Sequence, residues 1–209
     1  MNKNILQLLL VASLTLLGCP AQLETNNDDS SPDKIEGEEE TVSTSSIHGG
    51  SPAPETWEDC SGQLEDHPCD FSFVDQFGDT FQLYDNYGTV IVLDFSTMWC
   101  SVCNNIAHEA QSFMDTYGSQ DFLWVTVLIE NSQGEEPTEE DISDWADLYG
   151  IDDAPILKGD RSIVDYTAAD GFPIVSWPTL VIINREMVIE YGINGWNEST
   201  ITGWVEDTL

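Results

Sequence analysis

Two cysteines separated by two residues are the strongest chemical signal in this 209-residue sequence. Cys100 and Cys103 follow a β-branched apolar run at residues 89–95 and precede apolar residues that recur at helical spacing. Cysteines three positions apart on a first helical turn lie close enough to form a disulfide, and the helix N-terminus stabilises a thiolate at Cys100. The pair can therefore carry two electrons through a mixed disulfide, with Cys100 attacking and the more buried Cys103 resolving.

A metal site is the main chemical alternative for two close cysteines. Zinc needs four ligands, and the other pair, Cys60 and Cys69, does not repeat the Cys-x2-Cys spacing. His67 and His108 are the only histidines beyond residue 56. We therefore expect no metal, and no cofactor other than the redox-active disulfide itself.

Alternating secondary-structure signals surround the cysteine pair. The sequence predicts strands at residues 71–75, 80–83, 89–95, 122–129, 179–183 and 187–191, and helices at residues 100–118, at 138–150 and around 201–205. The first two strands flank Gly78 and form a hairpin. This order predicts an α/β fold with a central mixed β-sheet flanked by helices and an N-terminal β-hairpin extension.

The N-terminus carries an export signal. Residues 1–18 combine a short basic start with a mostly apolar stretch that is too short to span a bilayer as a mature helix. Residues 16–19, Leu-Leu-Gly-Cys, resemble the lipobox of bacterial lipoproteins. The resemblance implies cleavage before Cys19 and lipidation of that cysteine; a plain signal peptide with a chance cysteine is the alternative.

A tether is expected between the lipid anchor and a folded domain at residues 57–209. Residues 19–56 are acidic and poor in apolar side chains, so they cannot offset the entropy of ordering and should be a disordered linker. Export places the domain in the bacterial cell envelope, facing the periplasm or the exterior, where disulfides persist. Cys60 and Cys69 are therefore interpreted as a structural disulfide, with a second redox pair as the alternative.

Charge limits the partners of the domain. The chain has a formal net charge of −34, and residues 60–209 hold 28 acidic against three basic side chains. Nucleic-acid binding through phosphates is excluded, because it needs clustered Lys and Arg. Self-repulsion of this size destabilises the compact state unless salt screens it, which suggests a saline environment.

The segment around the cysteines also resembles a known family. Residues 90–103 are similar to the active-site strand and helix of thioredoxin-like proteins, and residues 176–180, Ser-Trp-Pro-Thr-Leu, stand in the place of that family's cis-proline. The match covers about residues 70–209. It is most similar to membrane-tethered extracytoplasmic thiol–disulfide oxidoreductases and the broader redoxin group.

The resemblance implies roles for individual residues. Cys100 becomes the attacking thiol and Cys103 the resolving thiol, and Trp99 shields the pair. Asp94 corresponds to the buried carboxylate that accepts the proton of the inner thiol, and burial without a cation should raise its pKa. An ordinary acid at a strand end is the alternative for Asp94.

The resemblance also implies how substrates are bound. Trp177, Pro178 and Thr179 would contact a substrate chain, and a cis Pro178 would place the backbone of Trp177 beside the disulfide for β-like pairing. The expected partners are protein thiols or disulfides, a membrane electron donor or acceptor, and the membrane through the lipid anchor.

Other functions stay open at this point. Residues 97–100 fit the Thr-x-x-Cys part of a peroxiredoxin site, but Leu93 replaces the proline of that group, and Arg161 and Arg185 are distant in sequence. A non-enzymatic envelope module with the same fold is a further alternative. A copper chaperone would need a wider cysteine spacing and a histidine after His108. The dipeptide between the cysteines, Ser-Val, is uncommon in the family and leaves the direction of electron flow open.

Overall fold

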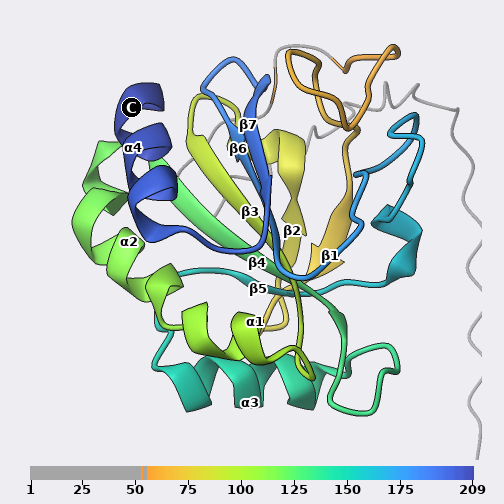
Figure 1. Ribbon diagram of the computed structural model, residues 1–209, viewed down its shortest axis with the longest axis vertical. Helices are drawn as coiled ribbons and strands as arrows, with labels where there is room; N and C mark the ends of the chain where they lie inside the picture. The colour runs from red at the N-terminus through yellow and green to blue at the C-terminus, as the bar shows by residue number, and fades with distance from the viewer. Residues whose placement is uncertain (1–52, 54–55) are drawn as a thin grey trace, which may run out of the picture. The chain divides into compact units, whose positions relative to one another are not determined.

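The computed structural model describes residue 53 and residues 56–209 (Figure 1). The expected signal peptide, Cys19 and most of the linker lie outside the described residues, so the statements about them stay predictions. Within the described part, no helix has the length and apolar character needed to cross a membrane.

A mixed five-stranded sheet forms the centre of the domain. β3 (Val90–Thr97) and β4 (Phe122–Glu130) are buried along their whole length and pair in parallel. β6 (Thr179–Ile183) runs antiparallel on the other side of β3. β5 (Ile156–Lys158) extends the sheet beyond β4 and β7 (Ile189–Asn194) extends it beyond β6, so the strand order is β5-β4-β3-β6-β7.

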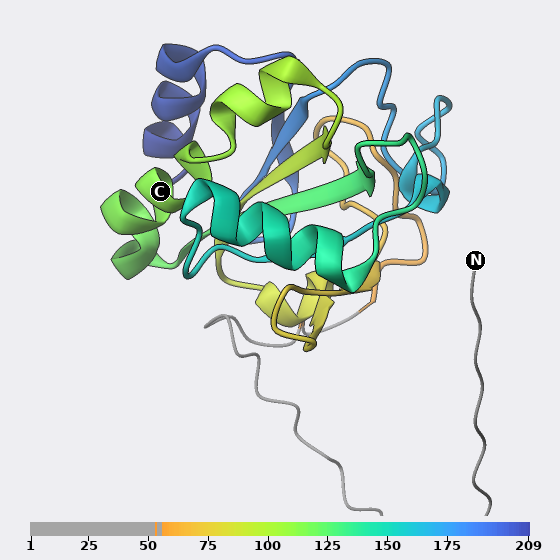
Figure 2. The same cartoon turned by 90° about the horizontal axis from the view of Figure 1, so that it is seen from below.

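The helices pack on one face of this sheet. They are α1 (Ser101–Ile106), α2 (Glu109–Tyr117), α3 (Glu139–Tyr149) and α4 (Glu198–Thr208). Their buried side chains contact Val90, Val92 and other residues of the same strand face, because side chains alternate along a strand. Figures 1 and 2 show the helices gathered around this side of the sheet.

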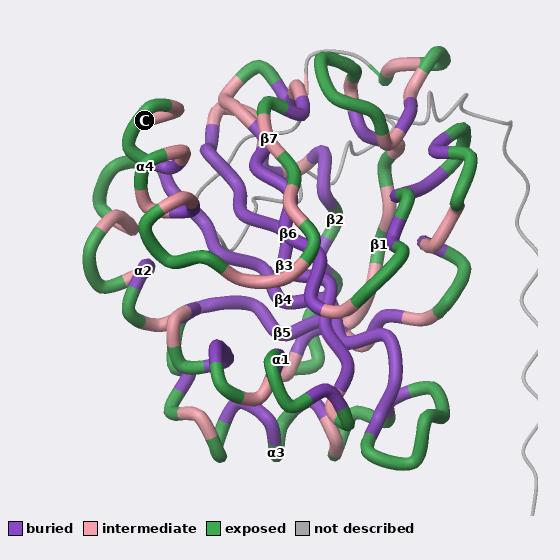
Figure 3. The backbone as a smooth tube through the Cα atoms, viewed as in Figure 1, coloured by how far each residue is buried: buried purple, intermediate pink, exposed green. Residues whose placement is uncertain are grey.

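The opposite face of the sheet is covered by the hairpin and by loops. β1 (Ser72–Val74) and β2 (Thr80–Gln82) are antiparallel and are joined by a turn in which Gly78 has a φ of +85°. Phe81 and Phe172 are buried on this face among the odd-numbered side chains of β3. The tube in Figure 3 shows burial concentrated in the sheet strands and exposure in the outer loops.

The predicted fold class is confirmed, with two local differences. The helix predicted over residues 100–118 is divided at residues 107–108 into α1 and α2, and the apolar spacing continues across the break, which is why the pattern predicted one helix. β5 lies between residues 150 and 179, where the sequence analysis predicted no strand. It has only three residues, too few for a periodic signal, and its pairing with β4 defines it.

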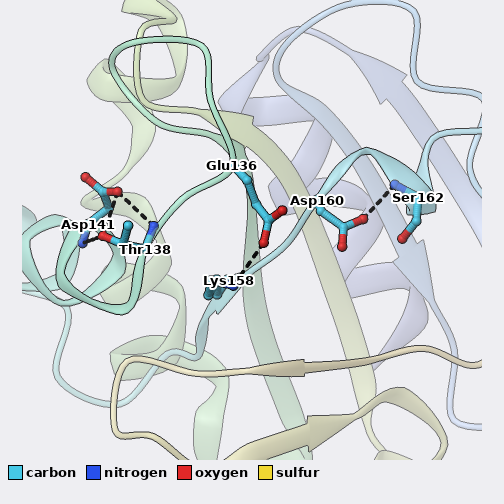
Figure 4. A network of polar contacts seen from close by, with 6 residues as sticks. All are labelled: Glu136, Thr138, Asp141, Lys158, Asp160 and Ser162. Atoms are coloured by element: carbon cyan, nitrogen blue, oxygen red, sulfur yellow. Dashed lines mark hydrogen bonds and ion pairs between the residues drawn. The ribbon is translucent and has the colours of Figure 1, made fainter.

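Polar contacts fix the connection between β4 and β5 (Figure 4). The Thr138 hydroxyl accepts the backbone N–H of Asp141, and the Asp141 carboxylate accepts the backbone N–H of Thr138 at 2.8 Å, which caps the start of α3. Lys158 of β5 pairs with Glu136 at 3.0 Å. The connection between β4 and β5 is therefore anchored at the start of α3 and at β5.

Cys60 and Cys69 are joined by a disulfide with a Cα–Cα distance of 4.8 Å. The loop that it closes is also attached to the sheet: the backbone N–H of Glu65 donates to the carbonyl of Ile189, and the N–H of Ile189 donates to the carbonyl of Asp66. The disulfide thus stabilises the segment that leads into the domain beside β7.

Replacing both Cys60 and Cys69 by Ser should lower the free energy of unfolding by about 2–3 kcal/mol, because the bridge restricts the unfolded chain. Urea unfolding of the oxidised protein measures this. Wild-type protein in strong reductant is the matched control and should unfold at the same denaturant concentration as the variant. Equal stability of the oxidised wild type and the variant would contradict a structural role.

Few acidic groups of the described residues have a cationic partner. Lys158 pairs with Glu136 and Arg161 pairs with Glu130. Arg185 instead donates to backbone carbonyls, among them that of Gln120 at 2.9 Å. Most of the negative charge is therefore balanced by solvent ions alone.

The melting temperature should rise by at least about 4 °C between about 0.1 M and about 1 M NaCl, because the screening length falls from about 10 Å to about 3 Å. Thermal unfolding followed by circular dichroism measures it. Sucrose at matched osmolality separates charge screening from solute exclusion. A flat or falling melting temperature in NaCl would show that self-repulsion is unimportant.

Candidate active site

Cys100 lies where the buried strand β3 passes into α1. It is the N-cap residue of that helix, and its sulfur accepts the backbone N–H of Cys103 at 3.3 Å. Such a donor stabilises a thiolate more than a thiol. Only 7% of Cys100 is exposed, and Cys103 is fully buried.

Cys103 lies behind Cys100 with its thiol reduced. Burial raises the pKa of the Cys103 thiol, and a hydrogen bond with Cys100 raises it further. The inner sulfur is therefore protonated near neutral pH. It becomes a nucleophile only when a neighbouring group takes its proton.

Asp94 lies in β3 on the strand face that carries the helices, and it is 2% exposed. Its carboxylate accepts hydrogen bonds from the hydroxyls of Ser96 at 2.6 Å and Thr126 at 3.4 Å. Burial raises the pKa of Asp94 to about 6, and the two hydrogen bonds oppose the shift in part. Asp94 also acts electrostatically on Cys103.

The loop before β6 lies against Cys100. The peptide bond between Trp177 and Pro178 is cis, and the Cys100 thiol donates to the Trp177 carbonyl at 3.6 Å. The hydroxyl of Thr179 lies 2.7 Å from the carbonyl oxygen of Ser176 and 2.9 Å from Asn194 Oδ1. The structure thus brings this loop and the cysteine pair together, while Thr179 bonds within its own loop and to β7.

Thr179 also lines a cavity of about 460 Å³. Its walls come from residues 62–64, from the loop residues Phe172 and Pro173, and from β6 and β7. Neither Cys100 nor Cys103 lines this cavity.

Trp99 is held to one side of the cysteine pair. Its indole N–H donates to Glu130 Oε2 at 2.8 Å, and Arg161 donates to the other oxygen of Glu130 at 2.6 Å. The Trp99 side chain stays 49% exposed. Sequence reasoning missed Glu130, although a charged residue at the end of a mostly apolar strand was a usable signal.

Asn104 was also missed by the sequence analysis. Its side-chain N–H groups donate to the carbonyls of Met98 at 3.0 Å and Cys100 at 2.7 Å, and its Oδ1 accepts the Tyr149 hydroxyl at 2.5 Å. The amide thus ties the turn that carries Cys100 to α3. Nothing in the sequence pattern distinguishes Asn104 from its neighbour Asn105.

Neither domain histidine faces the cysteines. His67 bonds to the carbonyl of Met187 and stacks on Trp57 with ring centroids 4.1 Å apart, and His108 pairs with Glu109. Within the part of the chain that the structure describes, no group of three or more His, Cys, Asp or Glu side chains is arranged to hold a metal ion.

The fold and the site define a thioredoxin-like protein of the redoxin group. Residues 64–192 match the AhpC/TSA family, so the chain belongs to that family. The thioredoxin-like protein YneN of Bacillus subtilis (strain 168) is 26% identical over 122 residues, which cover 58% of this chain and 65% of the relative. The chain thus matches slightly less than two thirds of that relative's length.

Solved structures show the same fold. The exposed lipoprotein thioredoxin of Streptococcus pneumoniae strain TIGR4 is 25% identical with a TM-score of 0.53, and the match covers 68% of this chain and all of that one. The thioredoxin domain of a thiol–disulfide oxidoreductase from Bacteroides vulgatus is 17% identical with a TM-score of 0.54, covering 71% and 96%. The predicted thioredoxin-like family and fold are confirmed by these matches.

Replacing Asp94 by Asn should stabilise the protein above about pH 6. The ordinary pKa of an aspartate is 3.8 and the pKa of folded Asp94 is about 6. Between these two values the folded protein keeps Asp94 protonated while the unfolded chain does not. The free energy of unfolding therefore falls by up to about 3 kcal/mol as pH rises from 3.8 to about 6. The Asn variant lacks this loss, because an amide does not ionise.

Urea unfolding at about pH 4 and about pH 8 measures the effect. The variant should match wild type at the lower pH and exceed it at the higher pH. A difference that is independent of pH would show that Asp94 does not titrate in this range.

Proposed function

We propose that this protein is a lipid-anchored, extracytoplasmic thiol–disulfide oxidoreductase that exchanges electrons with protein thiols or disulfides through Cys100 and Cys103. The single observation that carries the proposal is the placement of the Cys100 sulfur. It accepts the Cys103 N–H at a helix start and faces the Trp177 carbonyl, with a second thiol directly behind it. No cofactor beyond this dithiol is needed.

The reaction runs through a mixed disulfide. The Cys100 thiolate attacks a substrate disulfide, one substrate sulfur leaves, and Cys100 is joined to the other. The Cys103 thiolate then attacks Cys100, so that the Cys100–Cys103 bond forms and the substrate is released as a dithiol. The substrate gains two electrons, the cysteine pair loses two, and the reverse sequence oxidises a substrate dithiol.

The surroundings of Cys100 suit a polypeptide substrate. The Trp177 carbonyl accepts the Cys100 thiol, and once Cys100 has lost its proton the carbonyl can accept a backbone N–H of an extended chain. Trp99 and Val102 expose apolar surface at the start of α1, and Val175 exposes more in the loop before β6. The acidic surface elsewhere favours partners that are neutral or basic.

Localisation and further partners rest on the sequence. The lipobox-like residues 16–19 support an anchor at Cys19, and the linker would let the domain reach proteins of the envelope. A structural relative from Streptococcus pneumoniae is itself an exposed lipoprotein, which supports the same arrangement. A membrane electron donor or acceptor would renew the dithiol or the disulfide after each cycle.

A peroxidase is the second candidate function, because the chain belongs to the AhpC/TSA family. The Thr97 hydroxyl is buried and has no hydrogen-bond partner among the described residues. Against a peroxidase, Leu93 stands where that group has proline, and Arg161 is paired with Glu130. Consumption of hydrogen peroxide with a dithiol donor, at a rate above the Cys100→Ser variant, would support this candidate.

Trapping the mixed disulfide tests the oxidoreductase. The Cys103→Ser variant should accumulate a covalent adduct with a disulfide-containing protein such as insulin, because the resolving sulfur is missing. The Cys100→Ser variant should form no more adduct than the Cys100→Ser, Cys103→Ser double variant, because Cys103 is buried. Wild type should reduce insulin catalytically with a dithiol donor.

Non-reducing gel electrophoresis reads the adduct. The Cys100→Ser, Cys103→Ser double variant is the control for adducts through Cys19, Cys60 or Cys69. Equal adduct formation by the double variant and by Cys103→Ser would refute the assignment of Cys100.

A further inference from the structure

Ser96 places a hydroxyl between the buried carboxyl group and the inner thiol. Asp94 and Ser96 are two residues apart in β3, so both side chains project toward the helices. The Ser96 hydroxyl donates to Asp94 Oδ1 at 2.6 Å, and its interaction with Cys103 lowers the pKa of that thiol against the effect of burial. Asp94 has no hydrogen bond of its own to Cys103 among the described contacts and influences that thiol through its charge.

We propose that Ser96 relays the proton of Cys103 to Asp94 during the resolving step, an inference that rests on the proposed oxidoreductase function. The Cys103 S–H proton passes to Ser96 Oγ while the Ser96 hydroxyl proton passes to the Asp94 carboxylate. The hydroxyl is thereby regenerated, Asp94 becomes neutral, and Cys103 becomes a thiolate. That thiolate attacks Cys100, the bond between Cys100 and the substrate sulfur breaks, and the departing substrate thiolate takes a proton from solvent.

Burial favours a protein side chain as the carrier of this proton. Ser96 and Cys103 have no exposed surface and Asp94 has 2%, so bulk water does not reach the thiol. A hydroxyl donates one hydrogen bond and accepts another at the same time, which lets it pass a proton without a net change in its own charge. An apolar side chain at position 96 would leave the thiol and the carboxylate unconnected.

No charged side chain packs against Asp94 among the described residues, so Asp94 itself is the acceptor for the proton of Cys103. Thr126 of β4 and Leu180 of β6 are its register partners, and neither carries a charge. The residues that α2, α3 and α4 bury against this face are apolar. The titratable groups facing Asp94 are therefore the thiol of Cys103 from α1 and, through it, that of Cys100. Because the pKa of Asp94 is about 6, it is mostly ionised and ready to accept a proton at neutral pH.

Stopped-flow reaction of the reduced full chain with Ellman's reagent separates the two thiol steps. Attack by Cys100 releases one thionitrobenzoate, and attack by Cys103 on the resulting mixed disulfide releases a second. Subtracting the Cys100→Ser, Cys103→Ser double variant removes the contributions of Cys19, Cys60 and Cys69. The second release is the resolving step in which Ser96 acts.

Ser96→Ala should leave the rate of the first release unchanged and slow the second by about 10- to 100-fold, in the lower part of the range for general-base effects. In wild type the second rate should rise with ionisation of Asp94 around pH 6, and Ser96→Ala should lose this inflection. Ser96→Thr keeps a hydroxyl and should restore both the rate and the inflection.

Thr126→Val is the matched control. It removes the other hydroxyl bonded to Asp94, which has no contact with Cys103 among the described residues, so the second rate above the inflection should stay within about twofold of wild type. The inflection should move to higher pH, because a hydrogen bond that favours the carboxylate is lost.

The outcomes distinguish the relay from the function on which it rests. Wild-type protein that releases no second thionitrobenzoate overturns the proposed function. A normal two-step wild type, with Ser96→Ala unchanged in the second rate and its pH profile, overturns the relay alone. Equal slowing of both steps in Ser96→Ala would show a structural role and would also overturn the relay.

Discussion

The hydrogen bond from the Cys103 backbone N–H to the Cys100 sulfur is the interaction around which this molecule is arranged. It exists because a strand buried on both faces, β3, ends at the first turn of a helix. Close packing around β3 fixes where that turn begins, and Asn104 ties the turn to α3. The reacting sulfur is thus positioned by the core of the domain, although it lies at the edge of the fold.

The chemistry behind that sulfur is maintained at a cost in stability. A carboxyl group buried in β3 among hydroxyls and apolar side chains ionises less readily than in water, and its pKa of about 6 measures this penalty. An apolar residue at position 94 would pack in the same place without this penalty. The raised pKa is also what makes Asp94 suitable as a base near neutrality, so stability and proton transfer make opposite demands on one residue.

Charge is distributed differently at the site and over the rest of the surface. The domain is strongly acidic, yet the acid beside Trp99, Glu130, is paired with Arg161 and bonded to the indole. The scarce cations of the domain thus lie where they secure structure: Arg161 at the site, Lys158 at the crossover and Arg185 at backbone carbonyls. Apolar and neutral groups are left around Cys100, a suitable surface for another polypeptide.

The sequence alone determined the α/β fold, the hairpin and the Cys-x2-Cys pair at a helix start, because these depend on local periodicity, turn residues and spacing. The loop of Pro178 was located by the resemblance to thioredoxin-like proteins. Tertiary structure decided the rest. The three-residue strand β5 exists only through its pairing with β4, and the contacts of Glu130 with Arg161 and of Asn104 with Tyr149 join residues more than 30 positions apart. Ser96 was visible as a strand residue, but its position between a carboxyl and a thiol depends on how α1 packs against β3, which local spacing does not encode.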